Sequence, residues 1–180
     1  DSVSSWEAPH GVTNLPYNEW DRAHNGAWYK PYGLDLEWQY PCIPSPYWHY
    51  ALPDGGVRLF SVLQKRPVKN LYGQKNLLLQ KFPEERFKVF AKLVFRPGKD
   101  LGEDAGITVM GTDYAALRLV DKGSSAELQY VVCKNADKDS SEEVTHVTDL
   151  PYADGSATVR VSIQVYPREE EKEVVARFSY

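Results

Sequence analysis

The sequence has few of the cysteine and histidine residues on which folds stabilised by disulfides or metal ions depend. Its 180 residues include two cysteines and four histidines, and the Cys-x-x-Cys and His-Glu-x-x-His spacings of metal sites are missing. One cysteine pair does not make a disulfide framework, so Cys42 and Cys133 form either one disulfide or two free thiols. A chain of this length buries roughly 70% of its unfolded surface and folds without such staples.

Long apolar runs and an excess of positive charge are also missing. No run approaches the ~20 apolar residues of a membrane-spanning helix, so no membrane span is expected. The formal net charge of −4 argues against nucleic acid as a partner, because phosphate binding needs a basic face. The chain starts with Asp1 and not with methionine, so we expect either a removed leader or a start inside a longer protein.

The aromatic residues and the charge are unevenly distributed. Residues 1–50 hold all five tryptophans and 11 of the 23 aromatic residues, with six acidic and two basic residues. Residues 51–180 hold 19 basic and 19 acidic residues. We expect a single domain over residues 1–180, with residues 1–32 as an arm that packs its rings on it. The alternative is a ring-lined binding edge.

From residue 57 onward the apolar residues recur with a period of two, which is typical of strands. Turn signals such as Asp154-Gly155 separate the segments at intervals of about 8–12 residues, as in sandwiches and jelly rolls. The sequence therefore predicts an all-β sandwich. In the expected strand over 86–96 both faces are apolar, which predicts a central strand with its outer face partly covered. The expected strands are 57–63, 77–80, 86–96, 105–110, 114–120, 126–133, 143–147, 157–165 and 173–180.

Catalytic and metal-binding patterns are weak. The acid triplet Glu-x-Asp-x-x-Glu of sandwich glucanases is missing. The Gly-x-Ser-x-Gly nucleophile elbow of Ser-His-Asp hydrolases is missing as well. His146 is interpreted as a half-exposed histidine of a sheet. Hard cations need several oxygen ligands, so the acidic turn with Asp100, Glu103 and Asp104 is a weak candidate for a structural calcium. No other cofactor is expected.

Sugar binding has stronger support, because sugar pockets combine aromatic rings with a few polar groups. On a strand, Trp38 and Tyr40 would share one face, and Glu37 and Gln39 the other. Trp38 is interpreted as a structural residue more than a ligand-binding one. The loop residues Tyr47 and Trp48 are the best candidates for exposure. The candidate ligand-binding residues are Trp38, Tyr40, Tyr47, Trp48, Glu37, Gln39 and His49.

Several stretches, in order, resemble the C-terminal β-sandwich of family 43 glycoside hydrolases. They are GLDLEWQY over 33–40, YW at 47–48, GVRL over 56–59, NLLLQ over 76–80 and EDAGITVM over 103–110. Tyr40 stands where that family usually has a second tryptophan. The final ARFSY resembles a family strand that further strands normally follow. We therefore expect either a truncated domain or a different closure, with an open sheet edge over 173–180.

The resemblance implies a concanavalin A-like sandwich beside a catalytic propeller that acts on xylosides or arabinosides. It implies that this chain is a non-catalytic accessory domain of a polysaccharide-degrading enzyme, acting outside the cell, in the periplasm or on the cell surface. Its expected partners are the propeller or a plant-type glycan of the xylan or arabinan class. The alternatives are a free-standing, lectin-like carbohydrate-binding module and a sandwich glycosidase with unrecognised acids.

Overall fold

The protein was examined as a computed structural model, which describes residues 34, 37–45, 47–52, 56–64, 68–98, 102–168 and 173–180. The arm expected over residues 1–32 lies outside the described residues. In the described part of the chain, no helix is long and apolar enough to cross a membrane. The elements are β1 (His49–Ala51), β2 (Val57–Leu59), β3 (Phe87–Phe95), β4 (Asp104–Val109), β5 (Tyr114–Asp121), β6 (Ser125–Cys133), the 3-10 helix η3 (Ala136–Lys138), β7 (Glu143–Pro151), β8 (Ala157–Arg168) and β9 (Glu173–Ser179).

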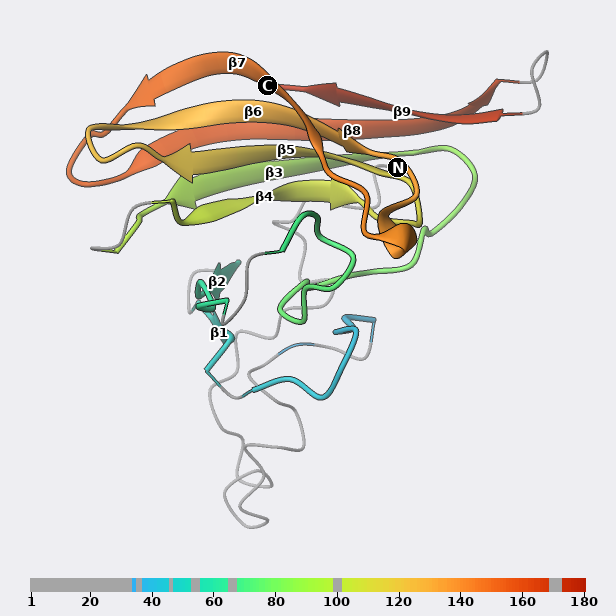
Figure 1. Cartoon of the computed structure of the whole chain (residues 1–180), viewed down its shortest axis with the longest axis horizontal. Coiled ribbons are helices and arrows are strands. Elements are labelled where there is room, and N and C mark those ends of the chain that lie inside the picture. Colours follow the sequence, from blue (N-terminus) through green and yellow to red (C-terminus); the bar gives the residue numbers. More distant parts are fainter. Residues whose placement is uncertain are drawn as a thin grey trace, which may run out of the picture.

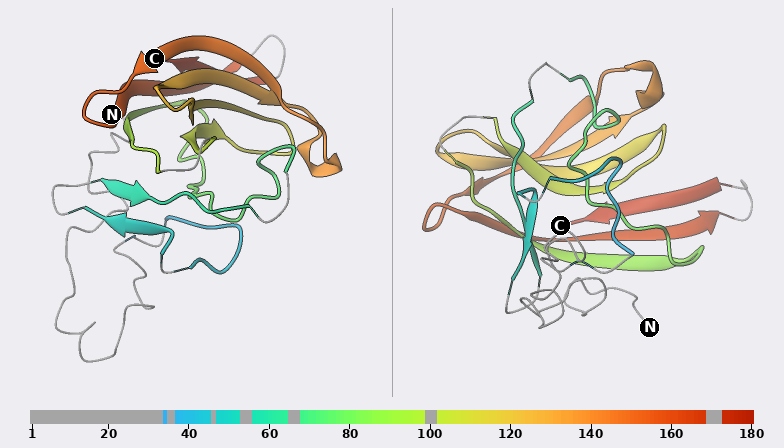
Figure 2. Two further views of the ribbon diagram at one scale, coloured as in Figure 1. Left: turned by 60° about the vertical axis from the view of Figure 1, so that its left-hand side comes forward. Right: turned by 90° about the horizontal axis from the view of Figure 1, so that it is seen from below.

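Two antiparallel sheets form a β-sandwich. One sheet has four strands in the order β4-β5-β6-β7, and the other has three in the order β3-β8-β9. Figure 2 shows them as two layers, and the short β1–β2 hairpin lies beside them as a separate ribbon. The prediction of an all-β sandwich is confirmed.

The main core lies between the two sheets. Leu117, Leu119 and Leu128 of the four-stranded sheet are buried against Val159 and Val161 of the three-stranded sheet. The period-two alternation explains this packing, because every second side chain of a strand points to the same face. Full burial of such an aliphatic side chain contributes about 1.5–3 kcal/mol.

A second apolar cluster covers the outer face of the four-stranded sheet. Tyr114, Val131 and Cys133 are buried there, and Leu71 packs against them. The backbone N–H of Leu71 donates to the Tyr114 hydroxyl at 2.8 Å. The Asn70 amide donates to the backbone carbonyl of Ala136 at 3.0 Å and to that of Ser140 at 2.7 Å. The loop around Asn70 is thus held on this face.

Two glycine positions shape the sheets. Asp154 and Gly155 both have positive φ values, 51° and 72°, as the two-residue hairpin turn between β7 and β8 requires. Gly106 of β4 lies close to β5, since a Cβ atom at this position would sit 2.1 Å from the Leu117 carbonyl oxygen. A side chain at residue 106 would therefore push these two strands apart.

The structure corrects several expected strands. Residues 77–80 form no strand and contribute only an isolated bridge between Leu79 and Gln39. The strand expected over 57–63 ends at Leu59. Because β3 is an edge strand of its sheet, the prediction of a central strand over 86–96 is wrong. The apolar residues on its outer face had suggested a neighbour on each side, but an apolar face does not determine strand order.

Candidate functional site

The β1–β2 hairpin lies apart from the two large sheets (Figure 1); it carries His49, and Tyr47 and Trp48 come directly before it in the chain. His49 pairs with Leu59, and Tyr50 pairs with Arg58. The backbone N–H of Phe60 donates to the Trp48 carbonyl at 2.9 Å, which extends the pairing by one step. Because neighbouring side chains alternate across the ribbon, His49 is buried while Tyr50 is exposed.

The inner side of the hairpin holds a compact cluster of three rings. The rings of Tyr40 and His49 are stacked with centroids 5.6 Å apart, and the ring of Trp48 meets Tyr40 edge-on at 5.5 Å. The Tyr40 hydroxyl and His49 Nδ1 form a 2.7 Å hydrogen bond. Edge-on and offset pairs of this kind contribute about 0.5–1.5 kcal/mol beyond their buried area. The cluster therefore anchors the hairpin.

The outer side of the hairpin forms an open, largely apolar hollow of about 480 Å³. It is lined by Tyr47, His49, Tyr50, Arg58 and Phe60. The Tyr47 side chain is 82% exposed, Tyr50 is 57% exposed and Phe60 is 45% exposed. We call the four exposed residues among them, Tyr47, Tyr50, Arg58 and Phe60, the hairpin surface. Its rings offer flat apolar faces, and its arginine offers hydrogen-bond donors.

The predicted ligand-binding residues lie in three places: the hairpin surface, the ring cluster and the segment over 37–40. Tyr47 lies on the hairpin surface, as expected from its loop position, whereas Trp48 is half-buried in the ring cluster. Trp38 and Tyr40 are half-buried while Glu37 and Gln39 are exposed, so the predicted alternation of faces holds. These four residues form no regular strand, and Gln39 makes only the bridge to Leu79.

Two residues of the hairpin surface were missed from the sequence, namely Arg58 and Phe60. The available signal was the turn after Leu52, which folds residues 57–60 back onto residues 48–51. Antiparallel pairing then places Arg58 opposite Tyr50. Reading the hairpin as a unit would have found them.

A network of charged and polar side chains lies on the outer face of the four-stranded sheet. Arg118 Nη1 is 2.7 Å from Glu142 Oε2 and 3.6 Å from Asp104 Oδ2. Arg118 Nε donates to Gln129 at 3.0 Å, and the Tyr114 hydroxyl donates to the second Glu142 oxygen. We call this group the Arg118 network.

The two carboxylates of the Arg118 network differ in environment. Burial raises the pKa of Asp104 above its usual value more than the nearby Arg118 guanidinium lowers it, and the Glu142 carboxylate raises it further. Both oxygens of Glu142 are engaged by Arg118 and Tyr114. Glycoside hydrolysis needs one acid and one carboxylate available to the sugar or to water. The arrangement therefore supports packing and not bond cleavage.

The acidic turn proposed for calcium is only partly described, because Asp100 lies outside the described residues. Glu103 accepts a 2.6 Å hydrogen bond from the Ser61 hydroxyl and another from the backbone N–H of Gly98. Asp104 faces Arg118. Within the described ranges, no group of three or more His, Cys, Asp or Glu side chains is placed to hold a metal ion.

The remaining reactive side chains lie elsewhere in the sandwich. His146 is a half-exposed residue of β7, as predicted, and its Nδ1 is 3.1 Å from Glu127 Oε1. Cys42 and Cys133 are free thiols. Burial raises the pKa of Cys133 above its usual value, so this thiol is a weak nucleophile at neutral pH.

Two stacked antiparallel sheets with a buried, aliphatic core define a β-sandwich domain of the concanavalin A type. Residues 29–180 match the family described as the β-xylosidase C-terminal concanavalin A-like domain, and the chain belongs to this family. The family is that of the domains found in family 43 glycoside hydrolases, which confirms the resemblance seen in the sequence. No curated protein and no solved structure matches the chain.

Proposed function

We propose that this chain is a non-catalytic accessory domain of a family 43 glycosidase and that the hairpin surface packs on the catalytic domain. We further propose that the enzyme acts on plant-type glycans of the xylan or arabinan class, outside the cell, in the periplasm or on the cell surface. The observation that carries the packing role is the exposed apolar area of Tyr47, Tyr50 and Phe60.

Exposed apolar side chains gather near this hairpin. Among the residues that the structure describes, six of the fourteen large, exposed hydrophobic ones fall between positions 43 and 63. Three of them, Tyr47, Tyr50 and Phe60, line one hollow, and exposed apolar patches mark interaction sites in soluble proteins. Aromatic residues and arginine are also the types that dominate binding energy at protein interfaces, and Arg58 lines the same hollow as the rings.

The second candidate function is glycan binding at the same surface, as in a carbohydrate-binding module. The observation in its favour is the ring of Tyr47, whose faces are open to a sugar because the side chain is 82% exposed. Arg58 lines the same hollow and could donate to sugar hydroxyls. The two roles are tested separately, with variants in the parent enzyme for packing and variants of this chain for glycan binding.

The packing role is tested with the double substitution Tyr50→Ser and Phe60→Ser in the parent enzyme. We expect a lower melting temperature of the catalytic domain and a lower turnover of a small aryl xyloside, because the apolar contact is lost. The matched control is Tyr72→Ser with Val144→Ser, which removes two similarly exposed apolar side chains elsewhere. Equal effects of both double variants would contradict the packing role.

The glycan role is tested on the 180-residue chain by affinity electrophoresis in gels with xylan, arabinan or β-glucan. If Tyr47 and Trp48 form a platform, Tyr47→Ala and Trp48→Ala should release the chain from any retarding glycan. Unchanged retardation would exclude the platform. Hydrolysis of an aryl xyloside by this chain alone would overturn its non-catalytic role.

A further inference from the structure

The outer face of the three-stranded sheet has an unusual composition for a protein of net charge −4. Strand register places its outward side chains in rows. Lys92 lies opposite Arg160, and Phe90 lies opposite Ser162. Gln164 pairs with Lys88 on one side and with Arg177 on the other. We call these outward residues of β3, β8 and β9 the cationic face.

Lys92, Arg160 and Arg177 give the cationic face its positive charge. Among the described side chains, no carboxylate lies within ion-pair distance of Lys92, Arg160 or Arg177. Like charges directly opposite each other destabilise a sheet, so the Lys92–Arg160 pair costs stability in the isolated chain. A bound anion would remove this repulsion.

Exposed rings lie among these cations. Phe90 is 45% exposed, and the Lys88 ammonium sits 4.6 Å from the centre of its ring. The Arg177 guanidinium lies 6.0 Å from the centre of the Tyr166 ring. Such pairs hold cations over ring faces. The face therefore combines aromatic rings with positively charged hydrogen-bond donors.

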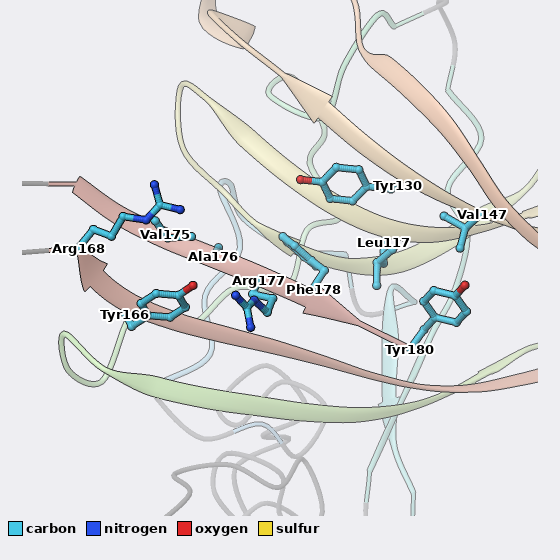
Figure 3. A pocket seen from close by; sticks show the side chains of 10 residues that line it. All are labelled: Leu117, Tyr130, Val147, Tyr166, Arg168, Val175, Ala176, Arg177, Phe178 and Tyr180. Carbon is cyan, nitrogen blue, oxygen red and sulfur yellow. The ribbon is translucent and has the colours of Figure 1, made fainter. Parts of the chain in front are cut away.

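The cationic face continues into an open groove at the edge of the sheet. The groove has a volume of about 450 Å³ and follows β9 (Figure 3). Tyr166, Arg168 and Arg177 line it, and so do Phe178 and Tyr180. Leu117, Tyr130 and Val147 of the four-stranded sheet line it too, so the groove lies along β9 where this strand faces the other sheet. It borders the cationic face through Tyr166 and Arg177.

We propose that the cationic face binds an acidic polysaccharide, that is, a glycan chain with carboxylate groups such as those of uronic acid residues. The sugar carboxylates would contact Lys92, Arg160 and Arg177, and the sugar rings would lie on Phe90 and Tyr166. Neighbouring strands are about 4.8 Å apart, so the opposite pair Lys92–Arg160 offers two cations to one carboxylate. Guanidinium groups bind carboxylates by two parallel hydrogen bonds.

A glycan fits this face better than an acidic protein does. The rings are interspersed with the cations in the same rows and are not gathered in an apolar centre, as in a protein interface. A sugar acid presents an apolar ring face and a carboxylate within one residue, which matches this alternation. The chain also belongs to a family of domains of polysaccharide-degrading enzymes. This inference does not rest on the hairpin surface, which is a separate site.

The test uses affinity electrophoresis of the 180-residue chain on a xylan that carries uronic acid side groups. The same polymer after chemical reduction of its carboxyl groups is the second gel. We expect retardation on the acidic polymer, falling as salt is added, and little on the reduced polymer. In Lys92→Glu with Arg160→Glu the affinity should fall about tenfold or more, since two ion pairs are replaced by repulsion.

The matched control is Lys75→Glu with Lys134→Glu, which makes the same charge change at two exposed lysines outside this sheet. It should bind the acidic polymer like the original chain. Because outward lysines and arginines contribute little to folding, both variants should keep the original melting temperature. If Lys92→Glu with Arg160→Glu unfolds, then Lys92→Gln with Arg160→Gln should still show the loss of affinity.

Three results would overturn the proposal. The first is equal retardation on the acidic and the reduced polymer, which would show that carboxylates are not recognised. The second is an equal loss in the two charge-reversed variants, which would reduce the effect to net charge. The third is binding of a DNA duplex, or of the catalytic domain, through Lys92 and Arg160 with no binding of the acidic polymer.

Discussion

The outer faces of the two sheets differ in how their charged side chains are placed: those of one face are paired and covered, and those of the other are exposed. On the four-stranded sheet, Arg118 is 18% exposed and is paired with Glu142, which is 10% exposed. On the three-stranded sheet, Lys92 and Arg160 lie opposite each other and are exposed. A loop around Asn70 covers the first face and is bonded to it. A covered face must satisfy its charges internally, whereas an open face can hold charges for a ligand.

The largest expected effect comes from breaking the covered face. Replacing Arg118 by leucine leaves the Glu142 carboxylate, which is 10% exposed, without its cation, and it should cost about 3 kcal/mol of unfolding free energy. Replacing Arg160 by leucine should change that free energy by less than about 0.5 kcal/mol. Urea unfolding at pH 7 of both variants checks the comparison. Equal losses would mean that the cationic face is also structural.

The sequence predicted individual strands well where apolar residues recur at every second position along the whole strand. The strand expected over 86–96 is β3 (Phe87–Phe95), and the strand expected over 126–133 is β6 (Ser125–Cys133). Alternation reports which side chains share a face, but it says nothing about neighbours. The edge position of β3 therefore could not be read, and neither could the absence of a strand over 77–80.

In the candidate sites, too, some features could be predicted from the sequence and others could not. The alternation of Trp38 with Gln39 was visible in the sequence, and so was the exposure of Tyr47. The cationic face was not visible, because Lys92 comes from a strand far in the chain from the two consecutive strands that carry Arg160 and Arg177. Only the register of β3 on β8 and of β8 on β9 brings them together.

A smaller effect is expected from loosening the cover of the four-stranded sheet. In Tyr114→Phe the Leu71 N–H loses its acceptor and Glu142 loses a donor, so we expect a loss of about 1–2 kcal/mol. Urea unfolding measures the loss, and amide hydrogen exchange at Leu71 should become faster. Tyr130→Phe is the control, since the Tyr130 hydroxyl makes no hydrogen bond to another described residue. Unchanged exchange at Leu71 would show that this hydroxyl does not hold the loop.

The smallest effect is expected at an exposed ion-pair group of the four-stranded sheet, and it depends on pH. Lys122 Nζ is 2.7 Å from Glu127 Oε2, and hydrogen bonds from Lys122 and His146 lower the pKa of Glu127 from 4.5 to about 2. A carboxyl whose pKa falls on folding stabilises the fold above its unfolded pKa, and the gain disappears as the pH falls through its folded pKa.

The variant Glu127→Gln should accordingly be less stable than the original chain at pH 7. The difference should shrink from about pH 4.5 downward and vanish near pH 2. Urea unfolding across this range gives the two curves. Lys122→Gln is the companion variant, because it removes the largest contribution to the shift and should flatten the pH dependence while Glu127 remains. A stability difference that persists at pH 2 would mean that Glu127 stabilises the sheet through packing and not through its charge.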